Sequence, residues 1–392
     1  MESPNRNLKH CLLHLLHLLL LAALCQGIEW TVPDVVGSLR SVGSTIIDPK
    51  MLPTPQGLLE GSKNLIAGYP FEFASSSINY LCSQALSSNK IRSRFTPDIK
   101  QMNFQLRTAC NKTNFPLLEA EAMWHSPQFD PKKGVVILAT GWTTTVNDSD
   151  TIEQLAQAYN CRGDVNFVAV DVARFVDTLY TWSAFNTDEI GENIARGLVK
   201  LLDVVKVENI HLIGHSLGAH IVGSAGRYLQ QFTGKTLPRI TGLDPAKPCF
   251  NEGEVLSGLQ RGDAHFIDVI HSNPGVLGKR DPMGDVDFYP GGLEPLPVGC
   301  LSVTCAHDRA WEYYEESVYP GNERNFLATR CSSLKRLRED LCTGEQQPMG
   351  YAVPHNIKGN YFLEVNGNKP YGKQSSGPRT ARLARCGICG QK

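Results

Sequence analysis

The sequence has no excess of charge of either sign, since 38 lysine and arginine residues stand against 39 aspartate and glutamate residues. This balance argues against binding of nucleic acid through a broad basic surface. No internal repeat is evident, and no stretch after the N-terminal segment is apolar for the roughly 20 residues that a membrane-spanning helix needs. The remaining composition, 42% hydrophobic and 20% charged, is that of a globular protein with a sizeable core.

The N-terminal segment has the layout of a secretory signal peptide. Arg6 and Lys9 precede an apolar run over residues 11–24, and small or polar residues follow. A membrane anchor is the alternative, but the run is shorter than a spanning helix requires. We therefore predict a signal peptide over residues 1–27 and secretion to the extracellular space.

Secretion determines how the ten later cysteines are interpreted. In an oxidising compartment, closely spaced cysteines are disulfide candidates before they are metal ligands. We predict the pairs Cys300–Cys305 and Cys331–Cys342 and leave the pairing of the others open. Asn111 and Asn147 each begin a glycosylation sequon, which fits a secreted surface.

Apolar segments alternate with helical segments through the middle of the chain. Continuous apolar strands separated by helices indicate an α/β fold with a mostly parallel sheet, covered by helices on both faces. Strands are predicted at 134–139, 165–170, 210–213, 239–243 and 266–270, and helices at 190–205, 219–229 and 311–318, with an edge strand at 361–365.

No linker divides the chain after the signal peptide, so we predict one domain over residues 28–372. Residues 373–392 are rich in lysine, arginine, glycine and serine and contain no acidic residue, which predicts a disordered basic tail. Docking of this tail on anionic lipid and a solvated tail without a role are both compatible with its composition.

Residues 214–218 read Gly-His-Ser-Leu-Gly and match the pattern G-x-S-x-G. A predicted strand precedes the motif and a predicted helix follows it, which is the context of a nucleophile elbow in α/β hydrolases. There Ser216 would lie on a tight turn with its Oγ exposed, above a helix N-terminus that favours developing negative charge. A glycine-rich turn without chemistry is the alternative.

A serine nucleophile needs a base, and the base needs an orienting acid. In this fold the order along the chain is serine, acid, histidine. Asp244 follows the predicted strand 239–243, so it lies at the same carboxyl edge of the sheet as Ser216. Asp171 precedes the serine and is predicted to be structural.

The base is one of four histidines that follow Asp244, and spacing alone does not choose among them. A disulfide between Cys300 and Cys305 would fix the loop that presents His307, which favours that residue. The four are His265, His271, His307 and His355.

Five segments together resemble the animal neutral lipase family, which includes pancreatic lipase, lipoprotein lipase, secreted phospholipases A1 and insect yolk proteins. In layout the chain is most similar to secreted insect lipases and phospholipases A1. The resemblance implies Ser216 as nucleophile, Asp244 as acid and His307 as base, with an oxyanion hole from the backbone N–H groups of Leu217 and Trp142. The segments are GHSLGAHIVGSAGR (214–227), GLDPAKPCF (242–250), DAHFIDVIHS (263–272), DVDFYPGG (285–292) and CAHDRAWEYYEES (305–317).

The chain departs from the family at the calcium loop, where one ligand position, Asp263, keeps a suitable side chain. The other three aligned positions are Val255, Gly258 and Gln260. Calcium takes six to eight oxygen ligands, so no metal and no other cofactor is expected. Cys249 matches a position that is often unpaired in the family, and we expect a free, buried thiol there.

The resemblance also predicts the substrate class, a lipid ester at a membrane or emulsion surface. In this family the lid lies between two disulfide-linked cysteines before the catalytic histidine, and here only four residues separate Cys300 from Cys305. Four residues cannot form an amphipathic helix over the site, which favours a phospholipase A1. A triacylglycerol lipase or general esterase is one alternative, and a non-catalytic, yolk-protein-like lipid carrier is the other.

Overall fold

A central β-sheet organises the part of the chain that the computed structural model describes, which is residues 98–141, 146, 149–172, 180–250, 256–375 and 386–390. All of these residues belong to one unit, Phe95–Lys392. The predicted signal peptide lies outside the described residues.

Eleven strands of the described residues form one sheet in the order β10-β9-β11-β8-β7-β6-β5-β3-β4-β1-β2. The seven strands from β11 to β4 are parallel, and antiparallel strands extend the sheet at both ends. The strands are β1 (Asn103–Arg107), β2 (Lys112–Pro116), β3 (Gly134–Ala139), β4 (Val165–Asp171), β5 (Ile210–His215), β6 (Arg239–Leu243), β7 (Phe266–Ile270), β8 (Val286–Pro290), β9 (Leu327–Cys331), β10 (Gln346–Pro348) and β11 (Gly359–Leu363).

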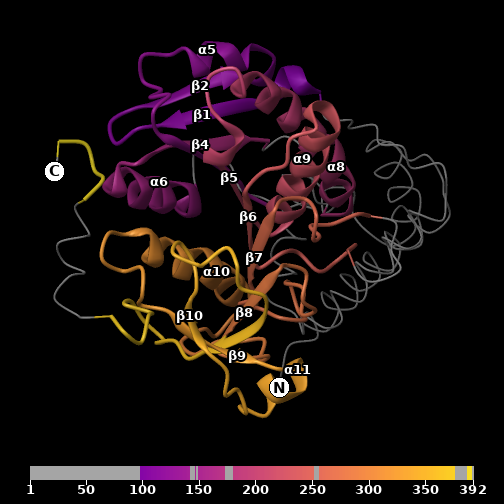
Figure 1. Ribbon diagram of the computed structural model, residues 1–392, viewed down its shortest axis with the longest axis vertical. Coiled ribbons are helices and arrows are strands. Elements are labelled where there is room, and N and C mark those ends of the chain that lie inside the picture. Colours follow the sequence, from indigo (N-terminus) through magenta and orange to yellow (C-terminus); the bar gives the residue numbers. More distant parts are fainter. Residues whose placement is uncertain are drawn as a thin grey trace, which may run out of the picture. The chain divides into compact units, whose positions relative to one another are not determined.

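Helices cover both faces of this sheet, as Figure 1 shows for α8 and α9 on one side and α6 and α10 on the other. Alternate side chains of a strand point to opposite faces, so each central strand contributes to two cores. In β3, Val135 and Ile137 pack with α8 and α9, whereas Val136 and Leu138 pack with α6 and α10. The helices are α5 (Ala120–Trp124), α6 (Asp150–Arg162), α8 (Tyr180–Leu201), α9 (Leu217–Thr233), α10 (Val303–Val318) and α11 (Leu334–Arg338), with short 3₁₀ turns η2 (Ile99–Gln101), η3 (Leu117–Glu119) and η4 (Val207–Asn209).

The predicted α/β fold with helices on both faces is confirmed, and the predicted strands at 134–139, 239–243 and 266–270 coincide with β3, β6 and β7. The prediction of an edge strand at 361–365 is wrong. Its counterpart β11 lies inside the sheet, parallel to β8 on one side and antiparallel to β9 on the other. Two further short strands, β9 and β10, complete the sheet beyond it.

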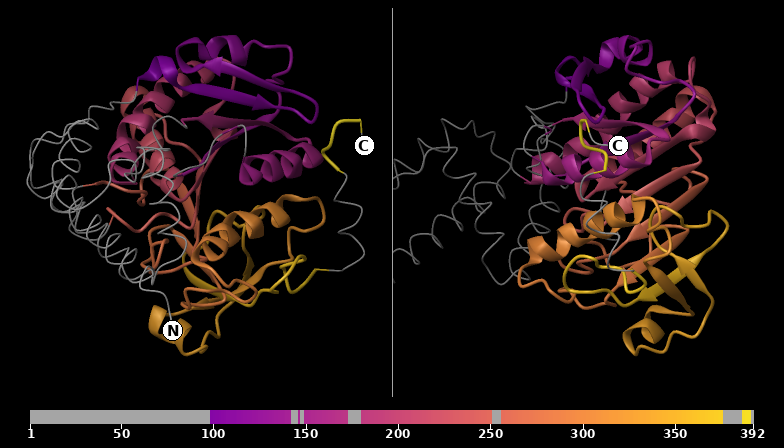
Figure 2. Two further views of the ribbon diagram at one scale, coloured as in Figure 1. Left: turned by 180° about the vertical axis from the view of Figure 1, so that it is seen from behind. Right: turned by 90° about the vertical axis from the view of Figure 1, so that its left-hand side faces the viewer.

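Two disulfides join residues 386–390 to the end of the sheet that carries β1 and β2, away from β9, β10 and β11. Cys386 is bonded to Cys161 of α6, and Cys389 is bonded to Cys110 in the turn between β1 and β2. Gln157 of α6 also donates a hydrogen bond to the carbonyl of Cys386 (3.2 Å). Figure 2 shows this segment beside the end of α6 in both views. The predicted disordered tail, residues 373–392, is therefore covalently attached to the domain at Cys386 and Cys389.

The expectation of a free thiol at Cys249 is wrong, because this fully buried cysteine is disulfide-bonded. Its bonding partner lies outside the described residues. Both predicted short-range pairs, Cys300–Cys305 and Cys331–Cys342, are formed. Of the helices that the structure describes, none has the length and apolar character of a membrane span.

Candidate active site

Ser216 lies on the sharp turn between β5 and α9, as the motif predicts. Its backbone has φ 59° and ψ −125°, a conformation that non-glycine residues rarely adopt. The turn is held from both sides, because Ser216 N donates to Leu243 O (3.0 Å) and Ser216 O accepts from Ala246 N (3.2 Å). A Cβ at Gly218 would fall 2.1 Å from Ala139 O, so the helix approaches β3 too closely for any other residue. The surrounding backbone therefore holds Ser216 in this strained conformation.

Asp244 follows β6 directly across from Ser216, because the register pairs His215 of β5 with Leu243 of β6. Its carboxylate is fully buried. Oδ2 lies 2.5 Å from Nδ1 of His307, and Oδ1 accepts hydrogen bonds from the backbone N–H groups of Ser272 (2.9 Å) and Asn273 (3.0 Å). Three hydrogen-bond donors on one carboxylate fix its orientation.

His307 comes from α10, and its side chain is 12% exposed. A carboxylate only accepts hydrogen bonds, so the Nδ1 that faces Asp244 carries a hydrogen, and in the neutral ring Nε2 keeps its lone pair. This is the tautomer that a general base needs. Of the four candidate histidines, His307 is the one that the structure pairs with Asp244.

The sequence placed His307 in a loop, but it lies in the second turn of α10. The helix begins at Val303, inside the loop closed by the Cys300–Cys305 disulfide, and the Ser302 side chain caps it by accepting from Cys305 N (3.2 Å). The predicted helix started eight residues later, at Trp311. A helix fixes the position of His307 more firmly than a loop would.

Of the two predicted donors of the oxyanion hole, the structure describes Leu217. Leu217 N lies at the N-terminus of α9, where the first backbone N–H groups have no partner within the helix. A Cβ on Gly141, which follows β3, would fall 2.9 Å from Leu217 N and 2.9 Å from Ser216 Oγ. The segment after β3 therefore passes directly against the serine. Trp142 itself lies outside the described residues.

His215 is a neighbour of the site that the sequence did not single out, although it lies within the G-x-S-x-G motif. Its Nε2 donates to the carbonyl of His307 (3.2 Å), and the centroids of the two rings are 4.7 Å apart. Burial, together with the nearby charge of His307, lowers the pKa of His215 to about 4. His215 therefore adds no second positive charge beside His307.

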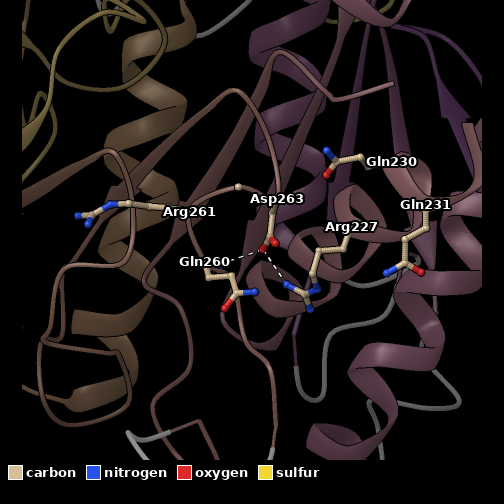
Figure 3. A pocket seen from close by; sticks show the side chains of 7 residues that line it. Arg227, Gln230, Gln231, Gln260, Arg261 and Asp263 are labelled. Atoms are coloured by element: carbon tan, nitrogen blue, oxygen red, sulfur yellow. Dashed lines mark hydrogen bonds and ion pairs between the residues drawn. The ribbon is translucent and has the colours of Figure 1, made fainter. Parts of the chain in front are cut away.

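The remnant of the family's calcium loop is occupied by an arginine. Arg227 of α9 donates through Nη1 to Asp263 Oδ2 (2.8 Å) and Gly258 O (3.1 Å), and through Nη2 to Ser257 O (3.1 Å). Asp263 Oδ2 also accepts from the backbone N–H of Gln260 (2.9 Å), as Figure 3 shows. Asp263, the one acidic residue among the four aligned ligand positions, is thus engaged by a cation of the chain itself.

Arg227 and Asp263 lie at a pocket of about 360 Å³. Gln230, Gln231 and Arg261 contribute side chains to it (Figure 3), whereas Ser216, Asp244 and His307 do not. Within the described ranges no group of three potential metal ligands occurs. Val255 lies outside these ranges, and independence of metal remains a prediction.

Of the two sequons, Asn111 is exposed in the turn between β1 and β2, next to the Cys110–Cys389 disulfide. Asn147 lies outside the described residues. Glycosylation at either position remains a prediction.

Three buried histidines should make the stability of the folded protein decrease in acid. Burial lowers the pKa of His215 to about 4, that of His220 to about 3, and that of His211 below its ordinary value. The unfolded chain, with histidine pKa values near 6.5, then binds more protons, so acid favours unfolding. We expect the free energy of unfolding to fall below about pH 6.5, by up to about 1.4 kcal/mol per pH unit for each histidine.

Chemical denaturation at pH 7.5, 6.5, 6.0 and 5.5 measures this slope. Buried Asp263, with a pKa raised to about 6, and Glu315 and Glu316, with raised pKa values, act in the opposite sense, because their folded forms retain protons that the unfolded chain releases. The histidine effect should therefore be clearest between pH 6.5 and 6. Replacement of the exposed His125 by glutamine is the control. Stability that stays constant down to pH 5.5 would contradict the prediction.

A strained serine at a strand–helix turn, beside an aspartate–histidine pair at the carboxyl edge of a mostly parallel sheet, defines the α/β-hydrolase fold. The family model described as Lipase matches residues 75–371, so the chain belongs to the lipase family.

Two kinds of relative share this family. The chain is 36% identical to Vitellogenin-3 of Drosophila melanogaster over 236 residues, which cover 60% of this chain and 56% of that protein. It is 37% identical to Pancreatic lipase-related protein 2 of Rattus norvegicus over 206 residues, covering 45% of this chain and 42% of that protein. The matched region spans about half the length of these relatives.

Proposed function

We propose that this protein is a secreted hydrolase of lipid esters that works through an acyl-enzyme on Ser216. The observation that carries the proposal is the 2.5 Å contact between His307 Nδ1 and the buried carboxylate of Asp244, formed beside the strained turn of Ser216. Nucleophile, acid and base occur in the chain order of the fold and converge at one edge of the sheet.

The chemistry follows from the protonation states. His307 Nε2 takes the hydroxyl proton of Ser216 as Oγ attacks the acyl carbon, and Asp244 stabilises the resulting imidazolium. The negative oxygen of the tetrahedral intermediate is placed near Leu217 N–H, with Trp142 N–H as the second proposed donor. His307 then gives its proton to the leaving alcohol. A water molecule, activated in the same way, releases the fatty acid and restores the serine.

Exposed apolar side chains next to the site support a lipid substrate. The loop between β8 and α10 carries Leu296, Val298 and Leu301, which are 42%, 57% and 99% exposed. Leu301 lies between the two cysteines of the predicted lid, and the chain leads from it into the helix that holds His307. Side chains of this kind gain free energy by entering an apolar phase, as lipid surfaces provide.

We propose further that phospholipids are preferred and that the sn-1 acyl chain is released. Of the four residues between Cys300 and Cys305, Val303 and Thr304 already belong to α10, so only Leu301 and Ser302 remain outside it. A cover of this size supplies little apolar wall for a third acyl chain and leaves space for a hydrated head group. The family resemblance favours the same substrate, since short lids accompany phospholipase A1 activity there.

The initial rate on phosphatidylcholine liposomes, compared with emulsified triolein, tests this preference. We expect a higher rate on phosphatidylcholine with 2-acyl lysolipid as the product, and Ser216→Ala protein serves as the blank. A clear preference for triolein, or release mainly from sn-2, would overturn the phospholipase A1 proposal. Either result would leave the ester hydrolase intact.

The similarity to vitellogenins supports a second candidate, a lipid carrier without catalysis. The two candidates differ in what they require of the site, because a carrier has no need of an ordered Ser216, Asp244 and His307. Absence of turnover on any ester by the folded wild-type protein, together with lipid that copurifies with it, would favour the carrier.

Four disulfides among the described residues, and a fifth bond at Cys249, support the proposed secretion. Such bonds persist in oxidising compartments and are rare in the cytosol.

A further inference from the structure

A second histidine–aspartate pair lies close to the proposed catalytic one. His271 follows β7, and its Nε2 is 2.9 Å from Oδ1 of Asp287 on the neighbouring strand β8. Both side chains are fully buried. The ring of His271 also stacks on Tyr289, with the planes 5° from parallel and the centroids 4.5 Å apart. The chemistry described above makes no use of this pair.

Both ring nitrogens of His271 face oxygen atoms of neighbouring residues. Nδ1 lies 2.8 Å from the carbonyl oxygen of Lys279, which can only accept, so Nδ1 carries a hydrogen. Asp287 Oδ1, which faces Nε2, also accepts hydrogen bonds from the backbone N–H groups of Met283 (2.9 Å) and Gly284 (3.2 Å). The contacts at both nitrogens therefore fix the orientation of the His271 ring.

His271 joins the two ends of the loop that surrounds the catalytic acid. At one end, the next two residues, Ser272 and Asn273, donate their backbone N–H groups to Asp244 Oδ1. At the other end is Lys279, whose carbonyl His271 binds and whose N–H donates to Pro245 O (2.8 Å).

Between these ends the backbone lies directly against the acid. A Cβ on Gly278 would fall 2.3 Å from Asp244 Oδ1, so the glycine leaves no space beside the carboxylate. The loop 272–278 thus fixes the oxygen of Asp244 that does not contact His307. Any shift of this loop would turn the carboxylate relative to His307 Nδ1.

We propose that His271 and Asp287 are positioning residues for Asp244: their buried hydrogen-bonded pair closes the loop 272–278 around the carboxylate and so aligns it with His307. This inference rests on the proposed hydrolase function. It predicts that loss of the pair lowers the rate of the chemical step and leaves substrate binding nearly unchanged.

The test compares kcat and KM of His271→Gln with the wild-type protein on a soluble short-chain ester, with active sites counted by a serine-directed phosphonylating reagent. We expect kcat per active site to fall about 10- to 100-fold, since small misalignments of a catalytic group have effects of this size, and KM to change less than about threefold. A purely structural role would reduce the number of active sites and leave kcat per site unchanged.

Two further variants serve as controls. His265→Gln alters an exposed histidine just before β7, at the opposite end of the strand from His271, and should behave as the wild type. The double variant His271→Gln/Asp287→Asn replaces the histidine–aspartate pair with a pair of amides that can still bind the Lys279 carbonyl. It should recover folding and part of kcat relative to either single variant, because no buried polar group is left without a hydrogen-bond partner.

A second readout needs no turnover. In proton NMR spectra, the His307 Nδ1–H that faces Asp244 should give a far-downfield signal, identified by its absence in His307→Ala, and this signal should shift or broaden in His271→Gln. An unchanged signal together with unchanged kcat per site would overturn the inference. If the wild-type protein hydrolyses no ester, the proposed function fails, and the NMR comparison alone decides the role of His271.

Discussion

Replacement of Ser216 by alanine should lower the rate of ester hydrolysis by about four to six orders of magnitude, with little effect on folding. The serine oxygen is the atom that forms the acyl-enzyme, and no other group in the described site can take its place. His307→Ala should have an effect of the same size, because without a base the hydroxyl keeps its proton. Rates on a soluble ester, measured with purified and folded protein, check both variants.

The rate losses of Ser216→Ala and His307→Ala should not be additive. A serine without its base and a base without its serine are equally unable to act, so the double variant should be no slower than either single one. Ser332→Ala, which changes an exposed serine before α11, is the matched control. Undiminished hydrolysis by Ser216→Ala protein would sink the proposed mechanism.

Replacement of Asp244 by asparagine should cost about four orders of magnitude in kcat, as for the equivalent change in other triads. Asparagine tolerates the left-handed backbone at this position (φ 42°) and keeps the side-chain shape, so the protein should fold. Its amide group, however, can present N–H to His307 Nδ1 and favour the tautomer that has its hydrogen on Nε2. His307 Nε2 would then present an N–H group to Ser216 and could not accept the hydroxyl proton.

The comparison with Asp171→Asn makes this prediction specific. Asp171 also ends a parallel strand, but β4 is separated from β5 by β3, and Asp171 pairs in register with Asn103 of β1. We expect kcat of Asp171→Asn to stay within a few-fold of the wild type. If Asp171→Asn were the inactive variant and Asp244→Asn the active one, the assignment of the acid would be wrong.

The central part of the fold was predictable because parallel strands buried on both faces appear in a sequence as continuous apolar runs. Five of the seven parallel strands were found in this way. β8 was missed because Asp287 interrupts its apolar run. In the folded chain this buried carboxylate has hydrogen-bond partners in His271 and in the backbone N–H groups of Met283 and Gly284. The position of β11 inside the sheet depends on long-range pairing that no local pattern records.

In the candidate site, too, some residues were predictable from local sequence patterns and others were not. Ser216 and Asp244 follow predicted strands, and chain order alone was sufficient to propose them. His307 needed the family resemblance, because β-branched Val303 and Thr304 concealed the start of α10. The pairing of Cys110, Cys161, Cys386 and Cys389 was left open, since connectivity cannot be deduced from spacing when the partners are more than 200 residues apart.

The two disulfides of the C-terminal segment have a consequence for biosynthesis. Cys110 and Cys161 are made early, whereas Cys389 and Cys386 follow 279 and 225 residues later. During translation the early thiols must therefore wait, or form temporary bonds that thiol–disulfide exchange later rearranges. A messenger truncated shortly before the codon for Cys386 would encode every residue of the proposed triad and still yield a chain with two unpaired thiols. With the secretion proposed above, such a product would be a substrate for quality control in the secretory pathway.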